Sequence, residues 1–112
     1  MAQVIIAKNL KDEILKKFKE ESKKIFNLML SLKDNPKKGK KLGQVKGVII
    51  KEIKYKNFRF YFITDGFKVK FLETEDLHNL VIKFIRMSNK KNQQKIINEI
   101  KIILRNLGDK GF

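Results

Sequence analysis

The sequence contains no cysteine and only one histidine, His78, among its 112 residues. Disulfide bonds and thiolate metal ligands are therefore excluded, and a lone imidazole cannot form the His/Cys cluster of a structural zinc site. We accordingly expect no metal and no cofactor. His78 falls in the polar stretch TEDLHN and is predicted to be a surface residue of a loop.

Long apolar runs are also missing. No stretch approaches the roughly 20 residues that are needed to cross a bilayer. The N-terminal segment MAQVIIAKNL has too short an apolar stretch for a signal peptide and lacks its basic start. No P-loop, GxGxxG, GxSxG or HExxH pattern occurs, so these nucleotide-binding and hydrolase signatures are absent. We therefore expect a cytoplasmic protein without a membrane partner.

Acidic residues are scarce: 12 Asp and Glu stand against 27 Lys and Arg, which gives a formal net charge of +15. Such an excess destabilises the compact state by repulsion and suits an anionic partner. The alternative is that the lysines only solubilise the surface. The distribution favours binding, because the nine Lys and Arg from Lys37 through Arg59 are accompanied by one acid, Glu52.

The apolar pattern predicts one α+β domain over residues 1–112. AQVIIAKN is typical of a short strand, and a helical pattern follows from about Lys11 to Lys33, with Asn9 as a candidate N-cap. The pattern is interrupted around residues 20–22, so one long helix and a helical hairpin are both compatible with it. Asn35-Pro36 and three glycines then predict a lysine-rich loop up to Gly47.

From Gly47 onward the apolar period becomes two, which predicts an antiparallel meander of about four strands. The strand candidates are GVIIKEIKY, FRFYFIT, FKVKFLE and LVIKFIRM, with turns expected at KN and at DG. A C-terminal helix follows, with Ser88 or Asn89 as its N-cap and Gly108 just past its end. Its predicted apolar stripe is Ile96, Ile100, Ile103, Leu104 and Leu107.

The alternation assigns side chains to two sheet faces. Phe58, Phe60 and Phe62 are predicted to lie in the core. The opposite face is expected to be open and basic, with Arg59, Tyr61, Lys68, Lys70 and Lys83. In the last strand, the same alternation predicts that Arg86 shares a side with Leu80, Ile82 and Phe84. An ordinary solvated sheet surface is the alternative for the basic face.

Basic residues also cluster at the start of the last helix, where free backbone N–H groups can approach a phosphate. Phosphate binding by such a surface is non-specific and salt-dependent, and exposed tyrosines can stack on unpaired RNA bases. The residues predicted to bind RNA are Lys37, Lys38, Lys40, Lys41, Tyr55, Lys56, Tyr61, Lys68, Lys70, Lys83, Lys91 and Lys95.

Three motifs in order, LKDNPKKGKKL, IIKEIKYKNFRFYFITDGFKV and FIRMSNKKNQQKIINEI, resemble the RelE/HigB toxin superfamily, most closely its HigB-like, phage-derived branch. The resemblance extends from about Leu15 to Leu107. It implies a small α+β toxin that cleaves mRNA on the ribosome without a metal, by attack of the RNA 2′-OH on its own phosphate. It also implies a cognate acidic antitoxin as partner.

The resemblance implies a set of catalytic residues. Arg59 matches the strand arginine of the family, Lys51 and Lys54 (or Lys56) match its lysine strand, and Arg86 and Lys90 (or Lys91) match its basic strand-to-helix junction. Where relatives have a C-terminal tyrosine, this chain has Ile96 or Gln94, and the histidines of some HigB-type members are absent. A non-catalytic RNA- or ribosome-binding protein, and a protein-directed toxin like the gyrase-poisoning relatives, are therefore alternatives.

Overall fold

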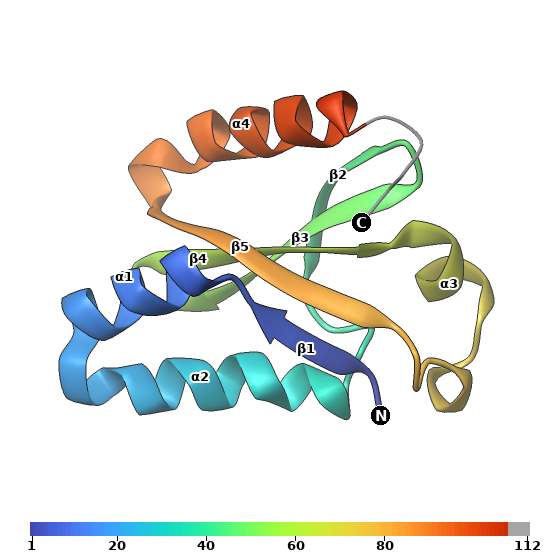
Figure 1. Ribbon diagram of the computed structural model, residues 1–112, viewed down its shortest axis with the longest axis horizontal. Coiled ribbons are helices and arrows are strands. Elements are labelled where there is room, and N and C mark those ends of the chain that lie inside the picture. Colours follow the sequence, from blue (N-terminus) through green and yellow to red (C-terminus); the bar gives the residue numbers. More distant parts are fainter. Residues whose placement is uncertain (108–112) are drawn as a thin grey trace.

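A computed structural model describes residues 1–107, which form an α+β fold around a five-stranded mixed sheet of order β1-β5-β4-β3-β2. A helical hairpin covers one face of the sheet and α4 covers the other (Figure 1). The strands are β1 (Gln3–Ile6), β2 (Lys40–Val45), β3 (Val48–Tyr55), β4 (Phe58–Asp65) and β5 (Val81–Asn89). The helices are α1 (Lys8–Phe18), α2 (Ser22–Leu30), α3 (Gly66–Phe71) and α4 (Gln93–Asn106).

The N-terminal helical segment is a hairpin, one of the two predicted forms. A 3-10 turn over Lys19–Glu21 separates α1 from α2, and Lys19 adopts a positive φ of 50°. The buried Ser22 hydroxyl donates a hydrogen bond to the carbonyl of Ile14 at 3.1 Å, which stabilises the corner. The predicted N-cap at Asn9 is wrong, because α1 begins directly after β1 with Ala7 in the cap position.

Four antiparallel strands form the predicted meander, but their membership differs from the prediction. Lys40–Val45, predicted as loop, is the edge strand β2 and pairs with β3. The predicted strand FKVKFLE is instead helix α3 and the segment that follows it. The Asp65 carboxylate accepts hydrogen bonds from the amides of Phe67 (2.9 Å) and Lys68 (3.1 Å), so the expected hairpin turn is a helix N-cap.

The turn between β3 and β4 at Lys56-Asn57 is confirmed, with Lys56 at φ 53°. The expected position of Arg86 is wrong. Tyr61 pairs with Arg86 and Phe62 pairs with Phe84, so β5 carries an extra residue between them. This irregularity moves every later residue of the strand to the other face. Arg86 consequently lies on the same face as Tyr61.

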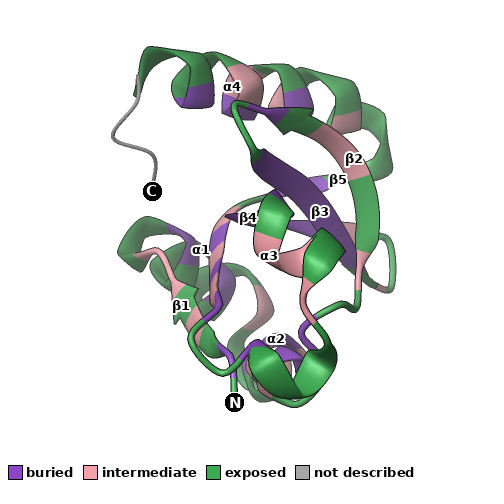
Figure 2. Cartoon of the chain, turned by 90° about the vertical axis from the view of Figure 1, so that its right-hand side faces the viewer, coloured by how far each residue is buried: buried purple, intermediate pink, exposed green. Residues whose placement is uncertain are grey.

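The sheet is buried on both faces. Phe60, Phe62 and Phe84 pack against the helical hairpin, as predicted for the aromatic face, while Phe58 is only half-buried. The other face packs Tyr61 and other side chains against the apolar side of α4, whose buried residues are Ile97, Ile100 and Leu104. Figure 2 shows the buried length of β3 and the one-sided burial of α4. The expected open basic face is therefore wrong.

The C-terminal helix is confirmed, although its stripe differs from the prediction. Ile97 is buried and Ile96 is half-buried, while Ile103 and Leu107 remain exposed. The predicted residue after the helix, Gly108, lies outside the described residues. Within residues 1–107, none of the helices combines the length and apolar character that crossing a bilayer requires.

Candidate nucleic-acid interface

The β3–β4 turn and the start of α4 lie at the same end of the sheet (Figure 1). Basic side chains from both segments line one pocket there. They line a cavity of about 430 Å³, which we call the basic pocket. Of the described residues that line it, none is acidic. The lining residues are Lys54, Lys56, Asn57, Arg59, Asn89, Lys90 and Lys91. The pocket thus unites three predicted catalytic residues with two predicted RNA-binding lysines.

Lys54 and Arg59 enter the pocket from adjacent strands. They are direct partners in the β3–β4 ladder, so their side chains leave the same face of the sheet. Arg59 is only 8% exposed, whereas Lys54 is exposed. Arg59 also pairs with Ser88 of β5 on its other side. The arginine is therefore held by strands on both sides, while Lys54 extends from the rim.

The junction between β5 and α4 supplies two further cations. The Asn89 side chain accepts a hydrogen bond from the Asn92 amide at 3.0 Å and caps a 3-10 turn over Lys90–Asn92. Asn89, one of the two predicted N-caps, thus caps the 3-10 turn that precedes α4, whereas the cap position of α4 itself is Asn92. This turn places Lys90 and Lys91, both exposed, at the pocket. Lys90 and Lys91 therefore share the pocket with Lys54 and Arg59, and no acidic side chain lines it among the described residues.

Beneath Arg59 lies a carboxylate that was not among the predicted site residues. Glu52 is 2% exposed, and its Oε2 lies 3.3 Å from Arg59 Nε. The Gln93 side chain, from the first residue of α4, donates to Glu52 Oε1 at 3.3 Å. The sequence does contain a signal for it, because Glu52 is the one acid between Lys37 and Arg59 and has the same strand parity as Lys54.

Tyr61 and Ser88 extend this buried polar layer. The Tyr61 Oη and Ser88 Oγ atoms are 2.7 Å apart, and Ser88 donates its single proton to the Asn89 carbonyl at 2.9 Å. Tyr61 is therefore the donor to Ser88. Burial raises the pKa of Tyr61. Its ring is 0% exposed, so the prediction that Tyr61 stacks on RNA bases is wrong.

Lys56 lines the basic pocket, whereas its chain neighbour Tyr55 does not. Lys56 Nζ pairs with the Glu21 carboxylate, and this contact raises the pKa of Lys56 and lowers that of Glu21. Tyr55 belongs to the face that packs on the helical hairpin, where its ring meets Phe18 edge-on at 6.4 Å. Tyr55 is consequently half-buried on the side of β3 away from Arg59.

Lys51 does not belong to the basic pocket. It is 4% exposed on the face toward the helical hairpin, where its Nζ donates to the Lys37 carbonyl at 2.7 Å. It lies 6.0 Å from the centre of the Phe62 ring. Burial lowers the pKa of Lys51. Grouping Lys51 with Lys54 was wrong, because residues three apart on a strand point to opposite faces.

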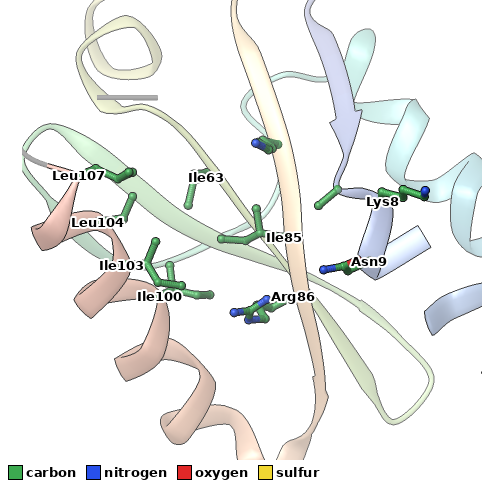
Figure 3. Close-up of a pocket in the computed structure, with 11 residues that line it drawn as sticks. Lys8, Asn9, Ile63, Ile85, Arg86, Ile100, Ile103, Leu104 and Leu107 are labelled. Atoms are coloured by element: carbon green, nitrogen blue, oxygen red, sulfur yellow. The ribbon is translucent and has the colours of Figure 1, made fainter. Parts of the chain in front are cut away.

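Arg86 and Lys83 line a different cavity of about 410 Å³ between β5 and the C-terminal half of α4. Its walls are mainly apolar and include Ile85, Ile100 and Leu104. Figure 3 shows Arg86 on the β5 side of this cavity. The prediction that Arg86 shares a site with Arg59 is therefore wrong, since the two side chains line separate cavities.

The remaining predicted RNA-binding lysines are scattered outside the basic pocket. Lys95, in the first turn of α4, lines a neighbouring depression that shares Asn89 with the basic pocket. Lys68 and Lys70 lie on α3 rather than on the sheet, which corrects their predicted place. Lys37 and Lys38 are exposed before β2, and Lys40 and Lys41 are exposed on that edge strand.

The acidic loop before β5 has the predicted surface character, and His78 is exposed there. In the part of the chain that the structure describes, no group of three or more Asp, Glu or His side chains is arranged to hold a metal ion. The chemistry of the basic pocket is therefore that of its cations, its two asparagines and the buried carboxylate below them.

Comparison with known proteins gave no match: no family model matches the chain, and the searches of curated proteins and of solved structures found no similar protein. The resemblance to the RelE/HigB superfamily stays a prediction from the sequence motifs. The site is accordingly defined by its own residues, as a compact cluster of five cations in one pocket.

Proposed function

We propose that the basic pocket binds the phosphodiester backbone of mRNA and that the protein is a metal-independent endoribonuclease of the RelE/HigB kind, acting on the ribosome. The observation that carries this proposal is the convergence of five Lys and Arg side chains on one cavity of about 430 Å³. Cations fixed around a phosphate stabilise the negative charge that develops on it during cleavage.

The proposed reaction assigns roles to three pocket residues. The RNA 2′-oxygen gives its proton to a solvent water molecule and forms a bond to the adjacent phosphorus, while the bond from phosphorus to the 5′-oxygen breaks and that oxygen takes up a proton. Arg59 has the planar guanidinium that suits two phosphate oxygens at once. Lys54 and Lys90 supply point charges, and either lysine when protonated can donate a proton to the leaving 5′-oxygen.

The direct test is expression of the protein followed by mapping of mRNA ends. We expect growth arrest and new mRNA 5′ ends with the wild type, and loss of both with Arg59→Ala and with Lys54→Ala. Lys23→Ala is the matched control, because Lys23 is an exposed lysine of α2 outside the pocket. Intact mRNA in arrested or unarrested wild-type cells would contradict the cleavage proposal.

A second function, RNA or ribosome binding without cleavage, is favoured by the composition of the lining. Among the described residues that line the basic pocket there is no carboxylate, imidazole or phenol to take the 2′-OH proton. This alternative predicts that RNA binding weakens steeply with salt and that no cleavage products form. Sequencing of the RNA recovered from wild-type complexes separates the two functions.

As the partner that restrains this activity we propose a small acidic antitoxin, in the cytoplasm where mRNA is translated. A net charge of +15 leaves the free protein with strong self-repulsion, which an acidic partner relieves. An adjacent reading frame that encodes a small acidic protein would support this proposal. Co-purification of the two proteins, lost in high salt, is the expected biochemical result.

A further inference from the structure

The buried ion pair below the basic pocket has a role that the pocket lining alone does not reveal. We propose that Glu52 is a positioning residue, which fixes the guanidinium of Arg59 toward bound phosphate, and that Gln93 links this pair to α4. The inference rests on the proposed function, because it concerns how the same pocket holds RNA.

Different atoms of the Arg59 guanidinium face Glu52 and the basic pocket. Arg59 Nε is buried and lies 3.3 Å from Glu52 Oε2, an ion-pair contact in which neither atom has a hydrogen-bond partner among the described residues, and Arg59 also lines the basic pocket. The carboxylate therefore lies on the Nε side of the guanidinium, which leaves the Nη nitrogens for a phosphate. Arg59 is only 8% exposed, so neighbouring atoms restrict its side chain, and Glu52 is the charged neighbour that sets its orientation.

Glu52 is in turn held from two elements. Its strand position in β3 faces Tyr61 of β4 in the ladder, and Gln93 of α4 donates to its Oε1 at 3.3 Å. The Glu52 carboxylate thus contacts Arg59 of β4 and Gln93 of α4. This arrangement connects the arginine to the same helix start that brings Lys90 and Lys91 to the pocket.

Energetics also favour a functional role for the pair. A carboxylate buried this deeply is costly without a partner, and an ion pair in the same place commonly contributes little net stability relative to apolar residues. A negative charge beside a phosphate site also repels RNA through space. The pair therefore needs a benefit that outweighs this repulsion, and the fixed orientation of Arg59 supplies it.

These two effects of Glu52 have opposite signs, which makes the proposal testable with Glu52→Gln. Removal of the negative charge alone would strengthen the binding of RNA. Loss of the orientation of Arg59 would weaken it, by about tenfold if one charge-assisted contact to phosphate is lost. We expect weakening, measured by fluorescence polarisation with a labelled single-stranded oligouridylate at fixed salt.

Four companion variants complete the experiment. Arg59→Ala is expected to weaken binding, and Glu52→Gln is expected to cause no further weakening in that background. Gln93→Ala, at a half-buried helix start, keeps the ion pair and removes one contact to Glu52; we expect binding about threefold weaker, near the lower range of a neutral hydrogen bond. Lys23→Ala is the control for an exposed charge.

The outcomes separate the two proposals. If wild type and Arg59→Ala bind RNA equally, the pocket is not the RNA site and the proposed function fails. If Arg59→Ala weakens binding but Glu52→Gln leaves it unchanged or stronger, the positioning role is overturned and the proposed function stands. A lowered melting temperature with unchanged affinity identifies a merely structural pair. If Glu52→Gln does not fold, unchanged affinity in Gln93→Ala overturns the proposal.

Discussion

Lys51 and Arg59 carry positive charge into buried positions with different partners. Arg59 meets the carboxylate of Glu52, whereas the Lys51 ammonium meets a backbone carbonyl and the Phe62 ring. A carboxylate compensates a buried charge far better than a neutral carbonyl does. Arg59, paired with a carboxylate, can therefore serve as a cation of the basic pocket. Lys51 instead responds to pH.

The pKa of Lys51 predicts a pH dependence of stability. Burial lowers this pKa below the ordinary 10.5 of lysine, so between the two values the unfolded chain binds more protons than the folded one. The free energy of unfolding contributed by this residue therefore rises as the pH climbs from the lowered pKa toward 10.5. Urea denaturation of wild type and Lys51→Met measures it, because the other lysines cancel in the difference.

We expect wild type to gain stability relative to Lys51→Met as pH rises in that window. Lys23→Met, at an exposed helix position, is the control for the loss of a lysine outside the core. A pH-independent difference for Lys51→Met would show that the buried ammonium keeps its ordinary pKa and contradict the prediction.

At the scale of elements, the apolar periods correctly predicted β1, β3, β4, β5, the N-terminal helical region and α4. The apolar periods gave wrong predictions in two segments. In one, a side-chain hydrogen bond sets the conformation, and in the other no apolar alternation is present. FKVKF alternates as a strand does, yet the Asp65 carboxylate bonds two following amides and starts α3. KKLGQV has glycine and lysines in place of an alternating apolar face, so edge strand β2 has no such signal.

The candidate site, like the fold, could be predicted from the sequence only where a local pattern specifies it. The alternation along β3 and β4 places Lys54 and Arg59 on one face, and the β5–α4 junction brings Lys90 close to them. Both the alternation and the junction can be recognised in the sequence. The extra residue in β5 shifts Arg86 to a different cavity from Arg59, and the apolar pattern of the sequence does not reveal this irregularity. The contact of Gln93 with Glu52 depends on how α4 docks across the sheet, which periodicity alone does not specify.

The cap at Asp65 gives a prediction for an element. Asp65→Ala removes two hydrogen bonds at the start of α3 and should lower the free energy of unfolding by about 1 kcal/mol. Asp12→Ala is a matched control, with the same chemical change and the same loss of charge at an exposed position of α1. Chemical denaturation that gives equal stability for the two variants would contradict the capping role.

For the whole molecule, the excess of positive charge is a reason to expect RNA binding and is also an explanation of any measured RNA affinity that needs no localised site. A formal net charge of +15 attracts any polyanion, wherever the charges lie. A localised RNA site requires instead that the cations of the basic pocket dominate the affinity. Loss of charge inside and outside the pocket must therefore be compared at equal net charge.

The most direct test is the affinity for single-stranded RNA of two triple variants that each lose three charges. One carries Lys54→Ala, Arg59→Ala and Lys90→Ala in the basic pocket, and the other carries Lys11→Ala, Lys16→Ala and Lys23→Ala on the exposed helical hairpin. We expect the pocket triple to bind about a hundredfold more weakly, with a shallower salt dependence, and the hairpin triple to bind almost as wild type. Equal losses in both triples would contradict a localised RNA site.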